Sequence, residues 1–458
     1  MELLKRNILK SLHGWNDSPI RSPLLLIGPR QIGKTTLLQI FGRQISRRFF
    51  EINFWSDSNQ TLKKIFQRSL EPAKILNELA DYFEVDAINP KEDVLFFDEI
   101  QESPEAYASL KLFKEKMKEL RILVTGSYLQ LFLKTEEIKK LPVGCVDEFY
   151  LGPLSYTEFL ENYDERIFQK YNQLDLNNFE ITIALHEKLM ELLNEYFFTG
   201  GLPEIIFLYL SGNKNYQTRQ DIRKKQKDLL NQYTLDFQKY GKSVHIKKID
   251  QIFQSIPFQL ERVNDQSTNR FSYKDLGKNI KYQSLHWSFQ YLKNAGLIIR
   301  SFIVSRPDHP FRVHEQKEER NLFKCFYFDI GLLNAALNSS IKISLEDWGS
   351  YKGYIAENFV AISLYNMFQT ELITYKKSSK HDSAEIEFLI TDENNNIIPV
   401  EVKSSKKALS SKSLDSFVKE FSPKRAYKLV PILSEKFKRN EYVTIPLYMI
   451  DKMEDGTA

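Results

Sequence analysis

The chain has 458 residues, a formal net charge of +4 and 42% hydrophobic residues, which is a globular composition. The length exceeds one ordinary core and predicts roughly two to four domains, and the small net charge neither requires nor excludes nucleic acid as a partner. Two cysteines, Cys145 and Cys325, are too few for a metal-binding motif or a disulfide framework, which favours a reducing compartment. The N-terminus lacks the apolar core of a signal peptide and no stretch approaches the ~20 apolar residues of a membrane span, so we expect a cytoplasmic protein with no membrane partner.

Basic residues are concentrated in two segments, residues 214–248 and 401–440. Such segments are typical of proteins that contact phosphate groups, but a solvated helix face has the same composition. Both interpretations stay open for both segments.

The first predicted element is a strand, a phosphate-binding loop and a helix within residues 22–45, SPLLLIGPRQIGKTTLLQIFGRQI. The apolar run is typical of a buried parallel strand and ends at Gly28, which is followed by four residues and then by Gly33-Lys34-Thr35. Glycines let backbone N–H groups turn toward phosphates, the lysine reaches the outer phosphates, and the threonine hydroxyl is a Mg²⁺ ligand. We predict a site for ATP and Mg²⁺ formed by Gly28, Pro29, Arg30, Gln31, Ile32, Gly33, Lys34, Thr35 and Thr36.

Further apolar runs predict strands of the same domain. The run DVLFFDEIQ ends in Asp98 and Glu99, and carboxylates at the carboxyl end of a parallel strand lie where such sheets bind nucleotide. Asp98 is expected to hold Mg²⁺ through water, and Glu99 to activate the attacking water. The run RILVTGS ends in a segment with Thr125 and Ser127, either of which would contact the γ-phosphate or the water. With a fourth strand at residues 49–53, the pattern predicts a doubly wound α/β domain.

These segments, followed by LGPLSYTEFL and GGLPEII, resemble over nearly the whole chain a large prokaryotic family of AAA-type ATP-binding proteins, AAA family 14. Its members carry the C-terminal domain of unknown function 4143, whose core resembles PD-(D/E)XK nucleases. The resemblance implies that Asp98 and Glu99 are the acidic pair and that Thr125 or Ser127 is the sensor. It implies nucleotide binding by Gly28, Gly33, Lys34, Thr35 and Thr36.

One departure from the family pattern concerns a positive charge near the γ-phosphate. Ahead of the PLSYTEF segment the family often has a Gly-Arg pair, whereas this chain has Gly144 and Cys145. An arginine at that position would serve as a finger that stabilises transition-state charge. Arg30 or a partner protein is the alternative source, although Arg30 is equally suited to a surface salt bridge.

The middle of the chain is predicted to be mainly helical. Residues 156–240 show helical apolar spacing, and the resemblance implies a lid over the nucleotide. Residues 272–304 predict a winged helix, whose second helix ends near Gly296 and is followed by a strand. The outward face of that helix is only weakly basic, so we favour packing or oligomerisation over DNA reading. The outward residues would be Lys281, Gln283, Ser284, His286 and Trp287.

The C-terminal segment predicts a second charged site. Residues 353–368 read as a helix with Glu357 near its start, and AEIEFLI alternates along a strand that carries Glu387. After a hairpin turn, Glu401 and Lys403 on the return strand share a face with Glu387. This is the PD-(D/E)XK arrangement, and the resemblance implies the same four positions. Glu387 and Glu401 would bind a second divalent metal, Mg²⁺ or Mn²⁺, while the lysine stabilises developing negative charge.

Here too the chain departs from the pattern, because this class of nuclease has aspartate where the chain has Glu387. A carboxylate displaced on the order of 1 Å can cost about 10²-fold in rate. A structural domain that does not cleave is therefore the alternative to a nuclease. The basic segment 403–428 would hold the phosphate backbone of DNA or RNA in an active site of this type.

We predict an α/β protein with a P-loop AAA-type core at residues 1–155, a helical lid at 156–245, a winged helix at 246–315 and a PD-(D/E)XK-like domain at 316–458. The preferred function is Mg²⁺-dependent ATP binding and hydrolysis, with the C-terminal domain as effector. The alternatives are an ATP-gated nuclease acting on DNA or RNA, and a non-hydrolysing nucleotide switch that binds nucleic acid, a protein partner or a second copy of the chain. The expected catalytic residues are Lys34, Glu99, Thr125, Ser127, Glu357, Glu387, Glu401 and Lys403.

Overall fold

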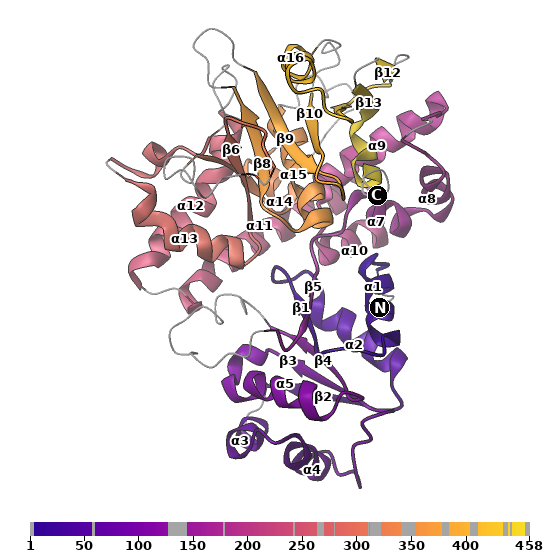
Figure 1. The fold of residues 1–458 in the computed structure, drawn as a ribbon, viewed down its shortest axis with the longest axis vertical. Coiled ribbons are helices and arrows are strands. Elements are labelled where there is room, and N and C mark those ends of the chain that lie inside the picture. The colour runs from indigo at the N-terminus through magenta and orange to yellow at the C-terminus, as the bar shows by residue number, and fades with distance from the viewer. Residues whose placement is uncertain are drawn as a thin grey trace. The chain divides into compact units, whose positions relative to one another are not determined.

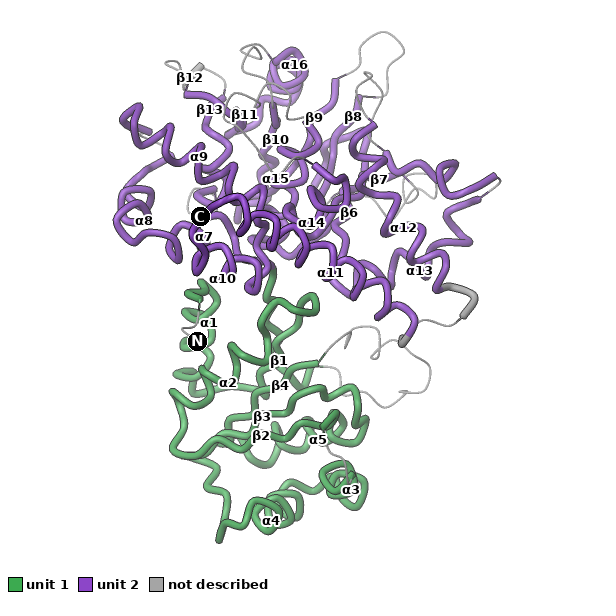
Figure 2. The backbone as a smooth tube through the Cα atoms, turned by 180° about the vertical axis from the view of Figure 1, so that it is seen from behind, with its two compact units in different colours: residues 1–152 green, residues 153–458 purple. Residues whose placement is uncertain are grey.

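The structure is a computed structural model, and the chain forms two compact units, residues 1–152 and residues 153–458 (Figure 2). The predicted sensor residue Ser127 lies outside the described residues. No helix among the described residues is both long and apolar enough to cross a lipid bilayer. The structure describes residues 4–56, 60–126, 144–176, 179–240, 243–262, 270–278, 280–309, 311, 322–339, 353–377, 384–403, 411–433, 438–439 and 442–453.

The first unit is built on a parallel sheet whose described strands follow the order β2-β3-β4-β1-β5 (Figure 1). Strands β1, β3 and β4 are almost entirely buried, as expected for continuous apolar runs in a parallel sheet. The mixed α/β class and these strands confirm the prediction. Strand β5 was not predicted, because its sequence DEFY has no apolar run. The bounds are β1 Leu24–Ile27, β2 Phe49–Asn53, β3 Val94–Asp98, β4 Arg121–Thr125 and β5 Asp147–Tyr150.

Helices α3, α4 and α5 bury apolar residues in one hydrophobic core with strands of this sheet. Helix α2 starts at the end of the glycine-rich loop that follows β1 and packs against β3 and β4. Helices α4 and α5 each have a proline in the first turn, where no backbone N–H is needed. The described helices of the unit are α1 Ile8–Asp17, α2 Lys34–Ile45, α3 Thr61–Arg68, α4 Pro72–Tyr82, α5 Pro104–Lys116 and the short 3₁₀ helix η1 Ile100–Glu102.

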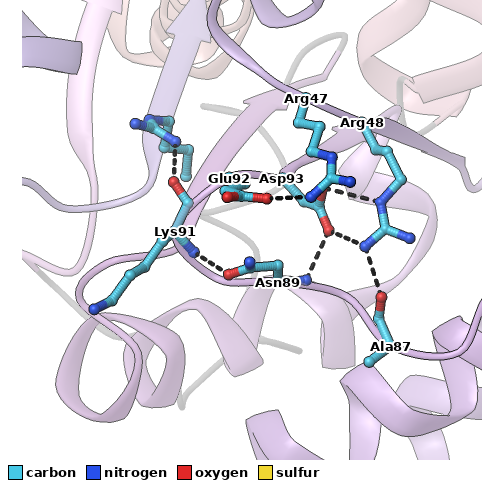
Figure 3. A network of polar contacts seen from close by, with 8 residues as sticks. Arg47, Arg48, Ala87, Asn89, Lys91, Glu92 and Asp93 are labelled. Atoms are coloured by element: carbon cyan, nitrogen blue, oxygen red, sulfur yellow. Dashed lines mark hydrogen bonds and ion pairs between the residues drawn. The ribbon is translucent and has the colours of Figure 1, made fainter.

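A polar network joins the amino ends of β2 and β3 (Figure 3). The Asp93 carboxylate is fully buried and accepts hydrogen bonds from Arg48 Nε at 3.1 Å and Arg48 Nη2 at 2.6 Å. The backbone N–H of Asn89 donates to the same carboxylate at 2.7 Å, and Arg47 pairs with Glu92 at 2.8 Å. Because a buried carboxylate is costly without such donors, the network favours one alignment of the two strands. It lies at the end of the strands away from their polar carboxyl ends.

The second unit contains a mixed sheet whose described strands follow the order β12-β13-β11-β10-β9-β8-β6-β7. The predicted hairpin is confirmed, because β9 and β10 pair antiparallel with Val400 opposite Phe388. Strand β11 then pairs parallel with β10, and Lys428 lies opposite Glu401. The bounds are β6 Ile298–Val304, β7 Phe323–Tyr327, β8 Leu372–Lys376, β9 Glu385–Thr391, β10 Ile397–Val402, β11 Tyr427–Val430, β12 Lys438–Arg439 and β13 Tyr442–Pro446.

Helices make up the rest of the second unit, and residues 156–240 are mainly helical as predicted. The predicted helix at residues 353–368 is α15, which contacts β6, β7, β8 and β10 (Figure 1). The described helices are α7 Tyr156–Tyr163, α8 Glu165–Asn172, α9 Ile183–Thr199, α10 Pro203–Ser211, α11 Tyr216–Tyr240, α12 Ser243–Glu261, α13 Tyr282–Asn294, α14 Ile330–Ala336, α15 Gly353–Phe368 and α16 Lys412–Phe421, with the 3₁₀ helices η3 Tyr273–Leu276 and η6 Leu447–Lys452.

The sheet of the second unit includes strands from both sides of residue 315, where we expected a domain boundary. Strand β6 follows helix α13 and pairs with β7 on one side and β8 on the other. All of its residues are buried, so it is an inner strand of this sheet. The five residues predicted to point outward from the α13 segment are exposed: Lys281, Gln283, Ser284, His286 and Trp287.

A break at Gly200-Gly201 separates α9 from α10 and is held by Asp329. One carboxylate oxygen of this buried side chain accepts a hydrogen bond from Gly201 N at 2.7 Å, and the other accepts one from Leu332 N at 2.8 Å. Gly200 has a φ of +72°, and a Cβ at this position would lie 2.3 Å from Asp329 Oδ1. Only glycine satisfies both constraints here.

Candidate nucleotide site and C-terminal charged cluster

The loop between β1 and α2 has the glycine conformations that a phosphate cradle requires. Gly28 has a φ of +144°, and a Cβ there would lie only 2.0 Å from the carbonyl oxygen of Leu151, just after β5. Gly33 adopts a left-handed conformation, with a φ of +88°, directly before the first turn of α2. The first turn of α2 exposes backbone N–H groups and the positive end of the helix dipole to the loop.

Lys34 and Thr35 are the first residues of α2, and both reach the loop or its neighbouring strand. Lys34 is buried, and its ammonium donates hydrogen bonds to the carbonyl oxygens of Gly28 at 2.9 Å and Pro29 at 2.6 Å. Burial lowers the pKa of Lys34 to about 8. The Thr35 hydroxyl donates to Asp98 Oδ1 at 3.1 Å, which brings together two oxygen ligands of the kind that Mg²⁺ prefers.

Asp98 ends β3 and has a partner that the sequence did not reveal. The amide of Asn53, at the end of β2, donates to Asp98 Oδ2 at 3.0 Å. Burial, and next the adjacent Glu99, raise the pKa of Asp98 to about 6. Asn53 could have been found only from the strand order, because β2 and β3 are neighbours in the sheet but 45 residues apart in the chain.

Glu99 follows β3 in a left-handed conformation with a φ of 52°, an uncommon backbone state for a residue with a side chain. The Gln101 amide donates to Glu99 Oε2 at 2.5 Å. The Gln101 side chain is buried, its Oε1 accepts no hydrogen bond from the described residues, and a Cβ on Gly126 would lie 2.5 Å from that oxygen. Gln101 therefore fills the space between Glu99 and the residue after β4.

The other residues predicted to bind nucleotide lie in the same loop or on the elements beside it, and they differ in solvent exposure. Ile32 is buried in the core and Pro29 is buried, whereas Arg30 is half-buried. Gln31 is exposed with a φ of 61°, and Thr36 is exposed on α2. Thr125 ends β4 with its side chain buried, beside Leu26 of β1.

Positions 6 and 145 are relevant to the question of which side chain supplies positive charge near the loop. Arg6, which belongs to no sequence motif, is buried and donates to the carbonyl oxygens of Gly152 at 2.7 Å and Ile32 at 3.4 Å. Cys145 is buried in the core of the first unit, so this position does not present a side chain to the loop. An arginine finger at position 145 would therefore require a different local backbone from the one observed.

The C-terminal cluster brings together the four predicted residues. Glu387 on β9 and Glu401 on β10 are both buried, and Lys403 follows β10. The Lys403 ammonium lies 2.6 Å from Glu401 Oε1 and 3.8 Å from Glu387 Oε1, while Val402 N donates to Glu387 Oε2 at 3.1 Å. Glu401 Oε2 accepts no hydrogen bond from the described residues.

Lys324 is a fifth member that the sequence did not predict. It lies on β7 with 1% of its side chain exposed, and its ammonium is 2.8 Å from Glu385 Oε1 and 3.3 Å from Glu357 Oε2. Lys428, within the basic segment that we expected to face nucleic acid, is instead buried on β11 opposite Glu401. Residues 404–410 of that segment lie outside the described residues.

The cluster does not fit the predicted second metal. Among the described residues, no group of three or more His, Cys, Asp and Glu side chains is arranged to hold a metal ion. Burial raises the pKa of Glu387 to about 8 and also raises that of Glu401, in both cases against the lowering effect of Lys403. Burial acts to lower the pKa of Lys324, but the surrounding glutamates outweigh it and raise that pKa.

Comparison with known families bears on both regions. Residues 21–160 match the family model described as an AAA domain. The chain carries an AAA domain. Residues 352–450 match a domain of unknown function (DUF4143), as predicted, and residues 190–342 match another, DUF8612, which spans segments that we assigned to the lid and the winged helix. A comparison with curated proteins finds no match.

Several solved structures are similar to this chain at low identity. A Walker-type ATPase of Pyrococcus abyssi shares 15% identity at a TM-score of 0.45, covering 73% of this chain and 96% of that one. The ORC1 protein of Aeropyrum pernix in complex with DNA shares 11% identity at a TM-score of 0.29, covering 72% of this chain and 89% of that one. AMPPCP-bound DnaA from Aquifex aeolicus shares 14% identity at a TM-score of 0.28, covering 64% of this chain and 89% of that one. Because these TM-scores are low, the similarities carry no conclusion about function.

Asp98→Asn is expected to stabilise the AAA domain near neutral pH. The pKa of Asp98 is raised from an ordinary 3.8 to about 6 in the folded chain, so this group favours folding below about pH 4 and loses that contribution as the pH rises through about 6. The variant has no carboxylate to ionise. Its melting temperature should therefore exceed that of the wild type near pH 8, and the difference should vanish near pH 4.

Thermal unfolding of both proteins across this pH range measures the effect. Asp81→Asn, at an exposed position on α4, is the matched control and should show no such pH-dependent difference. A difference between Asp98→Asn and wild type that does not change with pH would contradict the raised pKa.

Proposed function

We propose that the AAA domain binds ATP with Mg²⁺ and hydrolyses it. One observation carries the proposal: the Thr35 hydroxyl of the glycine-rich loop donates to the Asp98 carboxylate at the end of β3. Two motifs 63 residues apart in the chain thus meet at one edge of the parallel sheet. In such sheets nucleotides bind at the carboxyl ends of the strands.

Each residue of the site has a role in this proposal. The backbone N–H groups of the loop bind the phosphates, and Lys34 leaves the loop carbonyls to bind the outer phosphates. Thr35 and Asp98 would hold Mg²⁺, which neutralises charge that develops on the phosphate oxygens. Glu99 orients the attacking water and accepts its proton. Thr125 or Ser127 senses the γ-phosphate, and Arg30 or a partner protein supplies the remaining positive charge.

A second candidate function belongs to residues 316–458, which we propose as the effector of the ATPase. The order α15-β8-β9-β10-α16-β11, with Glu357, Glu387, Glu401 and Lys403 on adjacent elements, favours a domain derived from PD-(D/E)XK nucleases. Cleavage of DNA or RNA is the activity that this ancestry predicts. The lysines that pair with its carboxylates favour the alternative, a domain that binds nucleic acid or a protein partner without cleaving it.

Lys34→Ala should lower ATP affinity by about tenfold or more and abolish turnover, because the ammonium proposed to bind the outer phosphates is lost. Calorimetric titration with ATP and Mg²⁺, together with phosphate release, measures both effects. Lys111→Ala removes an exposed lysine of α5 in the same unit and serves as control. Unchanged ATP binding and turnover in Lys34→Ala would disprove the assignment. If the wild-type protein binds ATP but does not hydrolyse it, the result would favour the nucleotide switch.

Gln101→Ala should lower kcat by roughly 10- to 100-fold with KM nearly unchanged, because the amide that positions Glu99 is lost while the phosphate-binding loop is intact. Gly126→Ala should produce a similar decrease, since its Cβ would displace Gln101. Glu102→Gln, on the same 3₁₀ helix, is the control and should retain kcat. Full activity in both Gln101→Ala and Gly126→Ala would contradict this role.

A further inference from the structure

A lysine ammonium lies where the C-terminal carboxylates converge. Lys324 comes from β7, and its two partners come from β9 (Glu385, 2.8 Å) and from α15 (Glu357, 3.3 Å). Only 1% of its side chain is exposed, against 13% for Glu357 and 27% for Glu385. The ammonium is therefore the innermost charged group of this triad.

The strands between β7 and β9 have small side chains along the path that Lys324 must follow. Lys324 lies opposite Ser301 on β6, and the Ser301 hydroxyl is 2.8 Å from the Thr374 hydroxyl on β8. Thr374 in turn donates to the carbonyl oxygen of Glu387 on β9 at 2.9 Å. Because two small hydroxyl residues occupy β6 and β8 on this path, a long side chain from β7 can reach the carboxylate on β9.

Lys403 neutralises the other side of the cluster. Its ammonium contacts Glu401 at 2.6 Å and Glu387 at 3.8 Å, so each of the four carboxylates has a lysine ammonium within 4 Å: Glu357, Glu385, Glu387 and Glu401. A divalent cation needs several carboxylate oxygens at roughly 2.0–2.6 Å from one point. Oxygens that already pair with Lys324 and Lys403 are not arranged around such a point.

We propose that Lys324 takes the place of a divalent cation in this cluster and keeps it closed to metal. The positive charge that the carboxylates need is built into the chain, and it is held on a strand that precedes α15 in the sequence. A divalent-cation site arises among Glu357, Glu385, Glu387 and Glu401 only when the Lys324 ammonium is removed or withdrawn. This inference goes beyond ATP hydrolysis and does not rest on it.

The test is Mn²⁺ binding by the full chain without nucleotide, measured by electron paramagnetic resonance. All proteins carry Asp98→Ala, so that the predicted Mg²⁺ site of the AAA domain lacks the carboxylate expected to hold the metal. Lys324→Met keeps an unbranched side chain of similar length but removes the charge. It should bind about one additional Mn²⁺ per chain with a dissociation constant below about 1 mM, and Glu401→Gln should abolish that additional binding.

Two further variants separate the loss of this particular ammonium from a general loss of charge. Lys428→Met removes another buried lysine of the same sheet, which lies on β11 opposite Glu401, and should gain no Mn²⁺ site. Lys324→Arg retains the positive charge and should also gain none. If Lys324→Met is unfolded in metal-free buffer, Mn²⁺ should restore its circular dichroism spectrum, because the metal replaces the missing cation.

Three results would overturn the proposal. The first is Mn²⁺ binding by the protein in which Lys324 is intact, provided that Glu401→Gln abolishes this binding. The second is a folded Lys324→Met variant that gains no Mn²⁺ site, and the third is an unfolded one that Mn²⁺ fails to restore. None of these measurements uses ATP, so a failure here is distinct from a failure of the proposed ATPase function.

Discussion

An ion inside a protein must find partners to replace the water that it loses, and both units of this chain are organised around that requirement. In the first unit, Asp93 is matched by Arg48 at one end of the sheet, and Asp98 by Thr35 and Asn53 at the other. In the second unit, Lys324 is matched by two glutamates from different elements. Each of these pairings joins elements that are not adjacent in the chain, so the strand order and the buried charges depend on each other.

Two of the buried lysines, Lys34 and Lys324, illustrate opposite solutions. Lys34 donates to backbone carbonyls rather than to a carboxylate, and burial lowers its pKa to about 8. An anionic ligand that approaches this ammonium therefore gains a strong interaction. Lys324 already has its anions, and they raise its pKa despite burial. The first lysine is suited to an external phosphate, whereas the second completes an internal charge balance.

Much of what was predicted rested on patterns of residues that are close together in the chain. The strand-loop-helix segment around Lys34, the acidic end of β3 and the β9–β10 hairpin were all predicted, because each depends on residues close together in the chain. Of the residues that were missed, Asn53 and Lys324 act across the sheet, whereas Gln101 lies two residues after its partner Glu99. Asn53, Gln101 and Lys324 have no motif of their own, and they become informative only beside Asp98, Glu99 and Glu385.

The sequence by itself determined where the strand, the glycine-rich turn and helix α2 of the first unit form, because glycine spacing and an apolar strand specify that turn locally. It also determined that Glu387, Glu401 and Lys403 share a face, since alternation and a hairpin are enough for this. Only the tertiary structure decided that Lys324 reaches Glu385 on β9, because its strand is separated from β9 by β8 and β6 in the sheet. Strand order arises from packing across the whole unit, and no short stretch of residues encodes it.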